Sequence, residues 1–527
     1  MSSINWKIFT LTLRYASLLA CAFPDRNIII RVHVSQSELS RGQGGEKNSS
    51  LTKSIRLGRM AHMNETSPAS ADTRASNVSD MMMDDRETDE KPHVVFITGA
   101  HVSKCFQFAA ARSLGLSVIV IDSEKSSGQD LFKSGSIDLF VPLEISSDIE
   151  LGTAQCVECV RSLNRTVVGV VTFMEMAVLL SSRVAEALLL PGMPSSSVAT
   201  VRDKRLMREF LKQAGVANVQ SYSIRTEADL QAAADHVGMP AVLKPIVGAD
   251  SLGVKRVDTL EELTNAFADG KRVMNSVCIT SGLLCQTDAV SAAPILPVEF
   301  LLEEYLDGPE VDIDVLMHRG ICVYSAVSDN GPTVEPYFTE TYGVLPSLLP
   351  LACQQALIDL SIDSLRAIGF PSGLFHIEAK LTARGPRLIE INARLGGGPI
   401  CEMHKRVAGI DLAVEQLRIV TGLGPSEHVS LASTQRAFAY MTTNAVASGI
   451  VGSDLLFLDS FRSLPSVKRL SCRAQPGDRI VGPADGQPSW LVELWMESDS
   501  PADAGCLVAA IQAVSDQIAT AFASHYL

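Results

Sequence analysis

The stretch LFHIEAKLTARGPRLIEINARLGGGP, residues 374–399, decides the fold of this chain. Apolar and polar residues alternate on both sides of a predicted turn at 383–386, which is typical of a β-hairpin. Side chains two apart on a strand share a face, so Glu390 and Asn392 should point the same way. Glu378 can then lie opposite them on the first strand.

Two carboxylates this close create an electrostatic problem. Anionic groups about 4 Å apart repel by roughly 4 kcal/mol at an effective dielectric constant near 20, so the pair needs a shared proton or a cation. Oxygen ligands without a neighbouring Cys or His pair favour Mg²⁺ or Mn²⁺ over zinc. We expect Glu378, Glu390 and Asn392 to be metal ligands. The alternative is an ordinary hairpin whose charges face water.

Two further features adjoin the hairpin. Arg394 follows its second strand, and three glycines at 396–398 offer bare backbone beside it. His376 lies two residues before Glu378 and shares its strand face. It can contact a phosphate or an incoming amino acid, although a packed structural histidine is the simpler interpretation.

Length and composition bound the possibilities. A chain of 527 residues is long enough for two to four domains. It has 46% hydrophobic and 20% charged residues, as soluble globular proteins do. The net charge of −14 and pI near 5.3 exclude electrostatically driven binding of nucleic acid. An anionic ligand must therefore meet a local basic pocket.

The eleven cysteines are scattered, apart from Cys156 and Cys159. Their odd number and wide spacing favour reduced thiols in an intracellular compartment over a disulfide framework. We therefore expect a cytoplasmic protein. The C-x-x-C spacing lacks two further zinc ligands and is more typical of a helix with two half-buried thiols.

The first 91 residues differ from the rest. Residues 8–23 lean apolar, but Arg14 interrupts them, so they are not a convincing membrane span. The basic residues around this run leave organelle targeting open. Residues 36–91 are rich in Ser, Asn, Thr and charge, which predicts disorder. We expect 1–91 to be a disordered or targeting segment.

Ordered structure is predicted from about His93. A strand at 94–98, a helix at 106–114 and a strand at 116–122 form a β-α-β unit typical of a Rossmann-like domain. The glycine pattern of dinucleotide-binding proteins is missing from it. We assign residues 92–200 to this domain.

Two lysines and a loop of small residues follow. Lys204 heads a predicted helix at 202–214, and Lys244 lies near the end of a predicted strand. The loop 246–254 then supplies residues whose backbone N–H groups can turn onto an anion, namely Gly248, Ser251 and Gly253. Together these features fit a polyphosphate, whereas isolated surface lysines would carry no such meaning.

The segment LLEEYLDGPE, residues 301–310, is predicted to be a strand that ends in a turn. An alternating strand follows at 311–317. Two polar loops, 328–333 and 338–341, then precede the hairpin and are candidates for substrate contact.

These loops and the hairpin offer charges for amino-acid substrates. Asp329 or Glu340 can meet an ammonium group, and Arg394 or Lys380 can meet a carboxylate. Asp329 can equally cap a turn.

The order of these elements resembles the ATP-grasp ligases over about residues 93–425. The match comprises Lys204, Lys244, the small-residue loop, the EEYLDGPE turn and the E-x-N-x-R run. Two runs, AVSDNGPTVEPYFTET at 326–341 and IEAKLTARGPRLIEINARLGG at 377–397, look most like the carnosine synthases within that family.

The resemblance implies a fold and a chemistry. It implies an ATP-grasp domain at 201–425, preceded by the Rossmann-like pre-ATP-grasp domain and followed by a small α+β domain at 426–527. It further implies an ATP-dependent ligase that joins a carboxylate to an amino acid through an acyl phosphate. In the carnosine type the substrates are β-alanine and L-histidine. ATP and two Mg²⁺ or Mn²⁺ ions would be the cofactors.

The resemblance also implies roles for single residues. Those that would bind the nucleotide are Lys204, Lys244, Ser251, Gly253, Glu303, Leu306 and Glu310, with the last three at the adenine and ribose. Those that would bind metal are Glu378, Glu390 and Asn392. Arg394 would stabilise the transferring phosphoryl group.

Three classes of function remain open from the sequence. They are a ligase of the carnosine synthase type, another dipeptide or amino-acid ligase, and a non-catalytic nucleotide-binding protein. The intact acidic hairpin argues against the third. A biotin-type carboxylase would share the fold, but the chain has no biotin-carrier Met-Lys-Met. Small-molecule amino acids are the expected partners, and homo-oligomer formation is left open.

Overall fold

The computed structural model describes residues 29–32, 53–56, 91–216, 219–286, 296–431 and 433–526. Residues 1–87 and 88–527 form two separate units. In the first unit, β1 (Ile29–Val32) pairs antiparallel with β2 (Lys53–Arg56). The prediction for 1–91 otherwise lies outside the described residues, and all that follows concerns the second unit.

A parallel sheet opens the second unit, in agreement with the predicted Rossmann-like domain. Its described strands have the order β5 (Leu139–Pro142), β4 (Ser117–Asp122), β3 (His93–Ile97) and β6 (Val167–Val171). Helices cover both faces, so the strands are almost wholly apolar. The helices are α2 (Cys105–Ser113), α3 (Gly128–Lys133), α4 (Ile149–Ser162) and α5 (Val178–Ala187). As predicted, α4 carries Cys156 and Cys159, and burial raises the pKa of both thiols.

A smaller lobe follows. Its antiparallel sheet has the order β7 (Ser221–Ile224), β12 (Phe300–Glu304), β8 (Ala241–Pro245) and β9 (Lys255–Val257), with α8 (Leu230–Val237) and α9 (Leu260–Asn275) packed against it. A hairpin of β10 (Val277–Thr280) and β11 (Leu283–Gln286) extends from the lobe to the parallel-sheet domain. At its tip, the carbonyl of Ser281 accepts from the N–H of Gly99 at 3.3 Å.

The helix that enters this lobe starts later than predicted. The sequence indicates one helix at 202–214, but α6 (Ser195–Arg202) ends first and α7 (Lys204–Gln213) begins anew. The reason is Asp203, whose carboxylate accepts from the N–H of Leu206 at 3.0 Å and caps α7. Lys204 is therefore the first residue of its helix.

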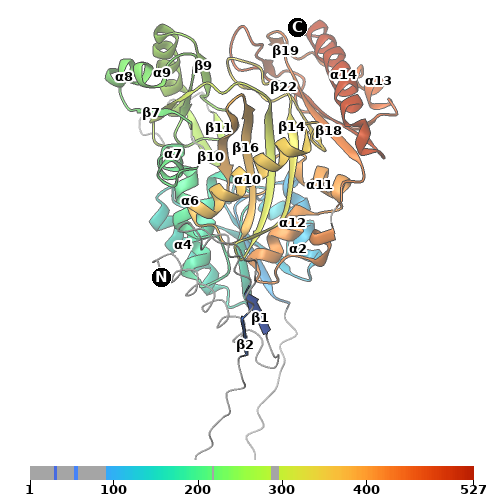
Figure 1. Cartoon of the computed structure of the whole chain (residues 1–527). Helices are drawn as coiled ribbons and strands as arrows, with labels where there is room; N and C mark the ends of the chain where they lie inside the picture. The colour runs from blue at the N-terminus through green and yellow to red at the C-terminus, as the bar shows by residue number, and fades with distance from the viewer. Residues whose placement is uncertain are drawn as a thin grey trace, which may run out of the picture. The chain divides into compact units, whose positions relative to one another are not determined.

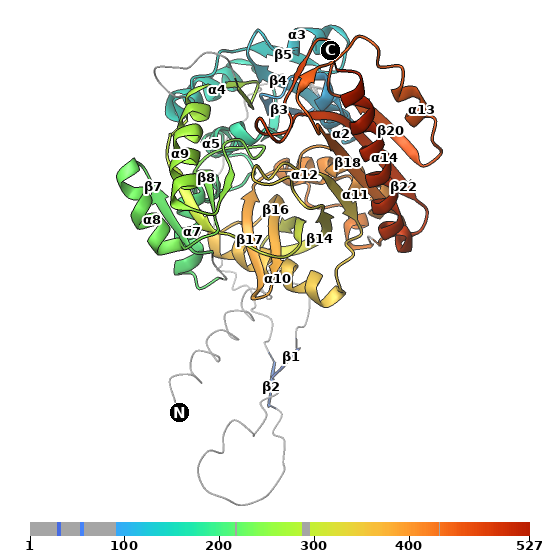
Figure 2. The same ribbon diagram turned by 90° about the horizontal axis from the view of Figure 1, so that it is seen from above.

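Eight of the described strands form one antiparallel sheet in the centre. Their order is β17 (Gly385–Asn392), β16 (Gly373–Thr382), β13 (Glu310–His318), β14 (Ile321–Asn330), β15 (Tyr342–Leu345), β18 (Ala437–Asn444), β22 (Trp490–Ser498) and β20 (Val467–Cys472). The strands of the predicted C-terminal α+β domain thus extend the central sheet. The small lobe and the C-terminal region lie on opposite sides of the central strands (Figures 1 and 2).

Helices cover this sheet on both faces. One face packs against α10 (Leu351–Ile368), and the other against α11 (Ile400–Ala408) and α12 (Leu412–Val420). The C-terminal strands pack against α14 (Ala504–Ser524), and α13 (Leu458–Arg462) and the short pair β19 (Gly449–Ile450) and β21 (Arg479–Ile480) complete this region. Among the described residues, one helical stretch, Pro501–Ser524, has the length and apolar composition of a membrane span. In the structure, α14 packs its apolar residues against β18 and β22, as a core helix of a globular domain does.

Candidate active site

The predicted hairpin is present as β16 and β17, and its charged side chains lie as expected. Glu378 pairs directly with Glu390 across the two strands, and with Asp312 on the other neighbour, β13. The opposite face of the same strands is apolar and packs under α10, with Ile313 and Ile377 fully buried. The three carboxylates therefore form a row on one face of the sheet.

The turn is tighter than predicted. The sequence indicates a turn at 383–386, but Gly385 and Pro386 already pair with Thr382 and Leu381. The turn is confined to residues 383–384, because Gly385 takes a φ of 90°, which is open to glycine without a Cβ clash.

A β-bulge at Ile389 sets which residues of β17 face the site. Leu388 faces the core while Glu390, two residues later, faces Glu378, because the register shifts by one residue between them. Arg208 of α7 donates to the bulge carbonyls of Leu388 and Ile389, each at 2.8 Å. Strict alternation in the sequence does not predict this bulge.

The metal ligands expected from the sequence lie together. Asn392 contacts Glu378, with its Nδ2 at 3.3 Å from Oε1. Burial, followed by the charges of Glu390 and Asp312, raises the pKa of Glu378 well above its ordinary value. A bound cation would relieve this repulsion, so the donor set suits Mg²⁺ or Mn²⁺ chemically.

This donor set is incomplete by itself. Within the described parts of the chain, no three His, Cys, Asp or Glu side chains are grouped so that they could hold a metal ion. Mg²⁺ is often held by one or two carboxylates with substrate phosphates and water as further ligands. The two glutamates and the amide therefore fit a metal that arrives with a nucleotide.

Lys204 lies at this row of carboxylates. Its Nζ is 2.9 Å from Oε1 of Glu390, and the two side chains are 9% and 17% exposed. The expectation that Lys204 meets ATP phosphates stays a prediction. The structure places its ammonium group beside a predicted metal ligand, where phosphate oxygens would also be needed.

Lys244 belongs to a buried ion-pair cluster. On β12, Glu303 accepts from Lys244 Nζ at 2.6 Å, and from Arg208 through Nε at 2.7 Å and Nη2 at 3.1 Å. Burial alone would raise the pKa of Glu303, but the charges of Arg208 and Lys244 lower it to about 2. The sequence predicts a role only for the Glu303 backbone, which lies inside the sheet between β7 and β8.

The other predicted nucleotide residues follow β8 and β12 in the chain. Lys380 Nζ lies 3.7 Å from Glu310 and 3.4 Å from the carbonyl of Leu306. Burial raises the pKa of Glu310. The loop between β8 and β9 has left-handed backbone at Ser251 and Gly253, with φ of 54° and 76°. Contacts of these residues with a nucleotide stay predictions.

Arg394 is held by a residue that the sequence interpretation missed. Its Nε donates to Glu175, which lies four residues beyond the end of β6 in the parallel-sheet domain and also pairs with Arg202. Burial would raise the pKa of Glu175, but the charges of Arg394, Arg202 and Lys204 lower it to about 2. Ligands of parallel sheets gather at the carboxyl ends of the strands, and this rule could have singled out Glu175.

A second polar row lies beside the first. His376 Nδ1 is 3.0 Å from Asp314 and its Nε2 is 3.6 Å from Asp312, while His404 Nε2 is 2.8 Å from the other oxygen of Asp314. Tyr324 completes the chain through a 2.7 Å hydrogen bond with His404. His376 is thus enclosed by protein, which supports the structural interpretation. The alternation EVDIDVLMH from Glu310 could have pointed to both aspartates.

The two candidate acids of the substrate loops, Asp329 and Glu340, lie in different surroundings. Asp329 lies on the face opposite Asp312 and accepts from Ser347 Oγ and from the N–H of Leu348 at 2.6 Å. This placement argues against the expected substrate contact, which stays a prediction, and the carboxylate holds residues 347 and 348 instead of capping the turn that follows β14. Part of the Glu340 side chain reaches solvent, but the protein packed around it and the charges of Asp312 and Asp250 raise its pKa to about 7.

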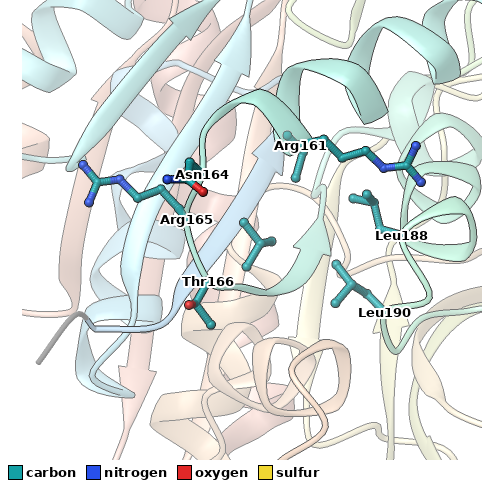
Figure 3. Close-up of a pocket in the computed structure, with 8 residues that line it drawn as sticks. Arg161, Asn164, Arg165, Thr166, Leu188 and Leu190 are labelled. Carbon is teal, nitrogen blue, oxygen red and sulfur yellow. The ribbon is translucent and has the colours of Figure 1, made fainter. Parts of the chain in front are cut away.

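A separate hollow lies at the amino end of β6. Figure 3 shows its lining, where the guanidinium groups of Arg161 and Arg165 point away from each other. The lining residues are Val160, Arg161, Asn164, Arg165, Thr166, Val167, Leu188 and Leu190. Parallel sheets bind ligands at the opposite, carboxyl ends of their strands, so this hollow is not the candidate site.

Two domain models and several known proteins match parts of this chain. The model of the ATP-grasp domain matches residues 237–402, and that of the ATP-grasp N-terminal domain matches residues 108–192. Carnosine synthase 1 of Gallus gallus is 29% identical over 345 residues, which are 64% of this chain and 36% of that protein. Alanine–anticapsin ligase of Bacillus subtilis is 28% identical over 240 residues, 44% of this chain and 49% of that protein. The chain thus spans less than half the length of these relatives.

Solved structures share the fold. The L-amino acid ligase from Bacillus licheniformis superposes with a TM-score of 0.64 at 22% identity, over 81% of this chain and 98% of that chain. The biotin carboxylase domain of the Hydrogenobacter thermophilus 2-oxoglutarate carboxylase, in complex with MgADP, superposes with a TM-score of 0.56 at 17% identity, over 78% and 87%. The matched models and the shared architecture show that this chain has the ATP-grasp fold, with an ATP-grasp domain at residues 237–402 and an ATP-grasp N-terminal domain at residues 108–192.

Proposed function

We propose that this protein uses ATP to join a carboxylate to the amine of an amino acid. The observation that carries the proposal is the cross-strand pair Glu378–Glu390, with Lys204 and Arg394 beside it, inside an ATP-grasp domain. The names of the relatives, a carnosine synthase and an alanine–anticapsin ligase, support amino acids as substrates.

The chemistry requires activation of the carboxylate, because a carboxylate is a poor acyl donor at neutral pH. Its oxygen attacks the γ-phosphorus of ATP, and ADP leaves. The neutral amine then attacks the acyl carbon of the acyl phosphate, phosphate leaves with the bridging oxygen, and the nitrogen loses a proton. Such a reaction depends mainly on positioning and on neutralisation of phosphate charge.

The residues of the site match these demands. Glu378, Glu390 and Asn392 would hold Mg²⁺ or Mn²⁺, which neutralises charge on the transferring phosphoryl group when bound. With Glu390 holding a metal ion, the ammonium group of Lys204 would be available to a phosphate oxygen. Arg394 is held through its Nε by Glu175, and its Nη1 donates to the carbonyl of Leu395 at 2.8 Å. Its Nη2 can therefore point at the phosphoryl group.

The carnosine type of reaction is our first candidate for the substrates, β-alanine and L-histidine. Its support is the likeness to carnosine synthase across 64% of the chain. Because Asp329 lies on the opposite face of the sheet, we assign the donor's ammonium group to Glu340, the other loop acid. Another dipeptide is the second candidate, supported by the likeness to the alanine–anticapsin ligase.

The test is a product screen with the purified full chain. The protein is incubated with MgATP and a mixture of amino acids that includes β-alanine, γ-aminobutyrate and L-histidine, and products are identified by mass spectrometry. We expect ADP, phosphate and a histidine-containing dipeptide. A dominant dipeptide without histidine would favour the second candidate. The absence of amino-acid-dependent ADP release would contradict the proposal.

A further inference from the structure

A bridge of side chains joins the small lobe to the loop between β14 and β15. Arg256 of β9 pairs with Glu335 of that loop, Nη1 to Oε2, at 2.6 Å. The N–H of Arg256 also donates to the carbonyl of Pro336 at 2.9 Å. Tyr305, which follows β12, donates its hydroxyl to the second oxygen of Glu335 at 2.7 Å. The guanidinium group lies 4.5 Å from the centre of the Tyr305 ring, so the three side chains contact one another.

The bridge lies between the two halves of the proposed site. Tyr305 precedes Leu306, and the ammonium group of Lys380 lies 5.7 Å from the Tyr305 ring and 3.4 Å from the Leu306 carbonyl. The loop that carries Glu335 also carries Glu340, the acid available to an amino-acid substrate. One carboxylate therefore connects the predicted adenine edge with the predicted amino-acid pocket.

The Arg256–Glu335 pair has more bonded partners than an ordinary surface ion pair has. Isolated exposed ion pairs contribute little to stability. Both oxygens of Glu335 are bonded, and a backbone hydrogen bond fixes the same two segments. Arg256 also meets Asp258 at 3.0 Å, which orients the guanidinium group from its own strand. A carboxylate held from two elements of another lobe has a defined place, and so does its loop.

We propose that Glu335 is a positioning residue that couples nucleotide binding in the small lobe to amino-acid binding at the 332–341 loop. The inference rests on the proposed ligase function for the identity of the two ligands. A nucleotide that favours this placement of β9 and Tyr305 also favours this placement of the loop. Linkage then requires that an amino acid raise nucleotide affinity by the same factor as the reverse.

The variant Glu335→Gln keeps the shape of the side chain and removes its charge. Glu299→Gln is the matched control, because the Glu299 side chain is as exposed as that of Glu335, at 32%, and pairs with Arg225 at 3.1 Å within the small lobe. Affinity for MgADP is titrated with and without saturating amino acids. In the parent and in Glu299→Gln, we expect amino acids to raise it about tenfold, within the usual range of such coupling. In Glu335→Gln, we expect less than about twofold.

Kinetics add a readout that a general loss of structure would not produce. We expect Glu335→Gln to raise the KM for amino acids several-fold while kcat at saturation stays close to that of the parent. Equal coupling in the variant and the parent, or no coupling in the parent, would overturn the proposal.

Limited proteolysis is a third readout, and it does not depend on ligase activity. Tyr337 and Phe338 give chymotrypsin a cleavage site in the loop, so the cleavage rate reports whether the loop is held. We expect Glu335→Gln to be cleaved several-fold faster than the parent and Glu299→Gln, and MgADP to protect only the latter two. A parent that binds no nucleotide would contradict the proposed function. Equal cleavage of Glu335→Gln and the parent, with nucleotide bound, would contradict the bridge.

Discussion

Glu303→Gln should destabilise the small lobe strongly, although it changes only one atom of the side chain. Glu303 lies between two buried cations, Arg208 and Lys244, and their side chains are 3%, 2% and 8% exposed. Glutamine keeps the shape but carries no charge. Both cations would then lack their buried counter-ion, and Lys244 Nζ would lose its 2.6 Å partner.

The magnitude follows from the pKa of Glu303, which falls from 4.5 to about 2 in the folded protein. A fall of about 2.5 corresponds to about 3 kcal/mol of stability at pH 7, and breaking a buried pair costs about 3–5 kcal/mol. A carboxyl group with a lowered pKa stabilises the fold fully above its unfolded pKa, which is 4.5 here. The contribution is lost as pH falls toward the folded pKa of about 2.

Hydrogen exchange of the β12 and β8 amides measures this directly, because it reports local unfolding of the lobe. At pH 7, about 3 kcal/mol corresponds to exchange about 100-fold faster in Glu303→Gln than in the parent. The surface variant Glu299→Gln should differ from the parent by less than about fivefold. Unchanged exchange in Glu303→Gln would refute the reasoning, and so would a large effect that persists undiminished at pH 3.

Three further predictions concern the metal site, the nucleotide site and the docking of the β10–β11 hairpin. Glu390→Gln should lower metal-dependent ADP release by orders of magnitude with the fold intact, and parent turnover in excess chelator would rule out the metal site. Lys244→Ala should weaken MgADP binding more than Glu310→Ala in calorimetric titrations, because a charge contact is lost instead of a hydrogen bond, and unchanged affinity would place Lys244 outside the site. Gly282→Ala should release the β10–β11 hairpin, because a Cβ there would lie 2.5 Å from a threonine hydroxyl of the parallel-sheet domain. Gly320→Ala has a similar φ and open space, so equal proteolysis of both variants would argue against hairpin docking.

The acidic hairpin could be predicted from the sequence, because the alternation along its strands and the chemistry of its side chains point to the same residues. The alternation in the hairpin places Glu390 and Asn392 on one face, and any hairpin with this register brings Glu378 to them. The same alternation predicts that Asp312 and Asp314 share one face of their strand. It does not predict which strands lie on either side. The pairing of β13 with β16 places Asp312 opposite Glu378 and Asp314 opposite His376.

The residues that could not be predicted come from distant parts of the chain. Glu175 meets Arg394 across 219 positions, and Arg208 meets Glu303 across 95. No local pattern reports such pairs. The bulge at Ile389 could not be predicted either, because it depends on strand pairing and on the carbonyl contacts of Arg208. Likewise, the C-terminal strands alternate like those of any small domain, and only their pairing shows that they extend the central sheet.

The central claim is that a carboxylate is activated by transfer of a phosphoryl group. The most direct test supplies the acyl-donor amino acid with ¹⁸O in its carboxylate, together with MgATP and the acceptor, and examines the released phosphate by mass spectrometry. The carboxylate oxygen that attacks the γ-phosphorus leaves with the phosphate, so the account predicts ¹⁸O-labelled phosphate in the same amount as dipeptide. Dipeptide formed together with unlabelled phosphate would contradict it.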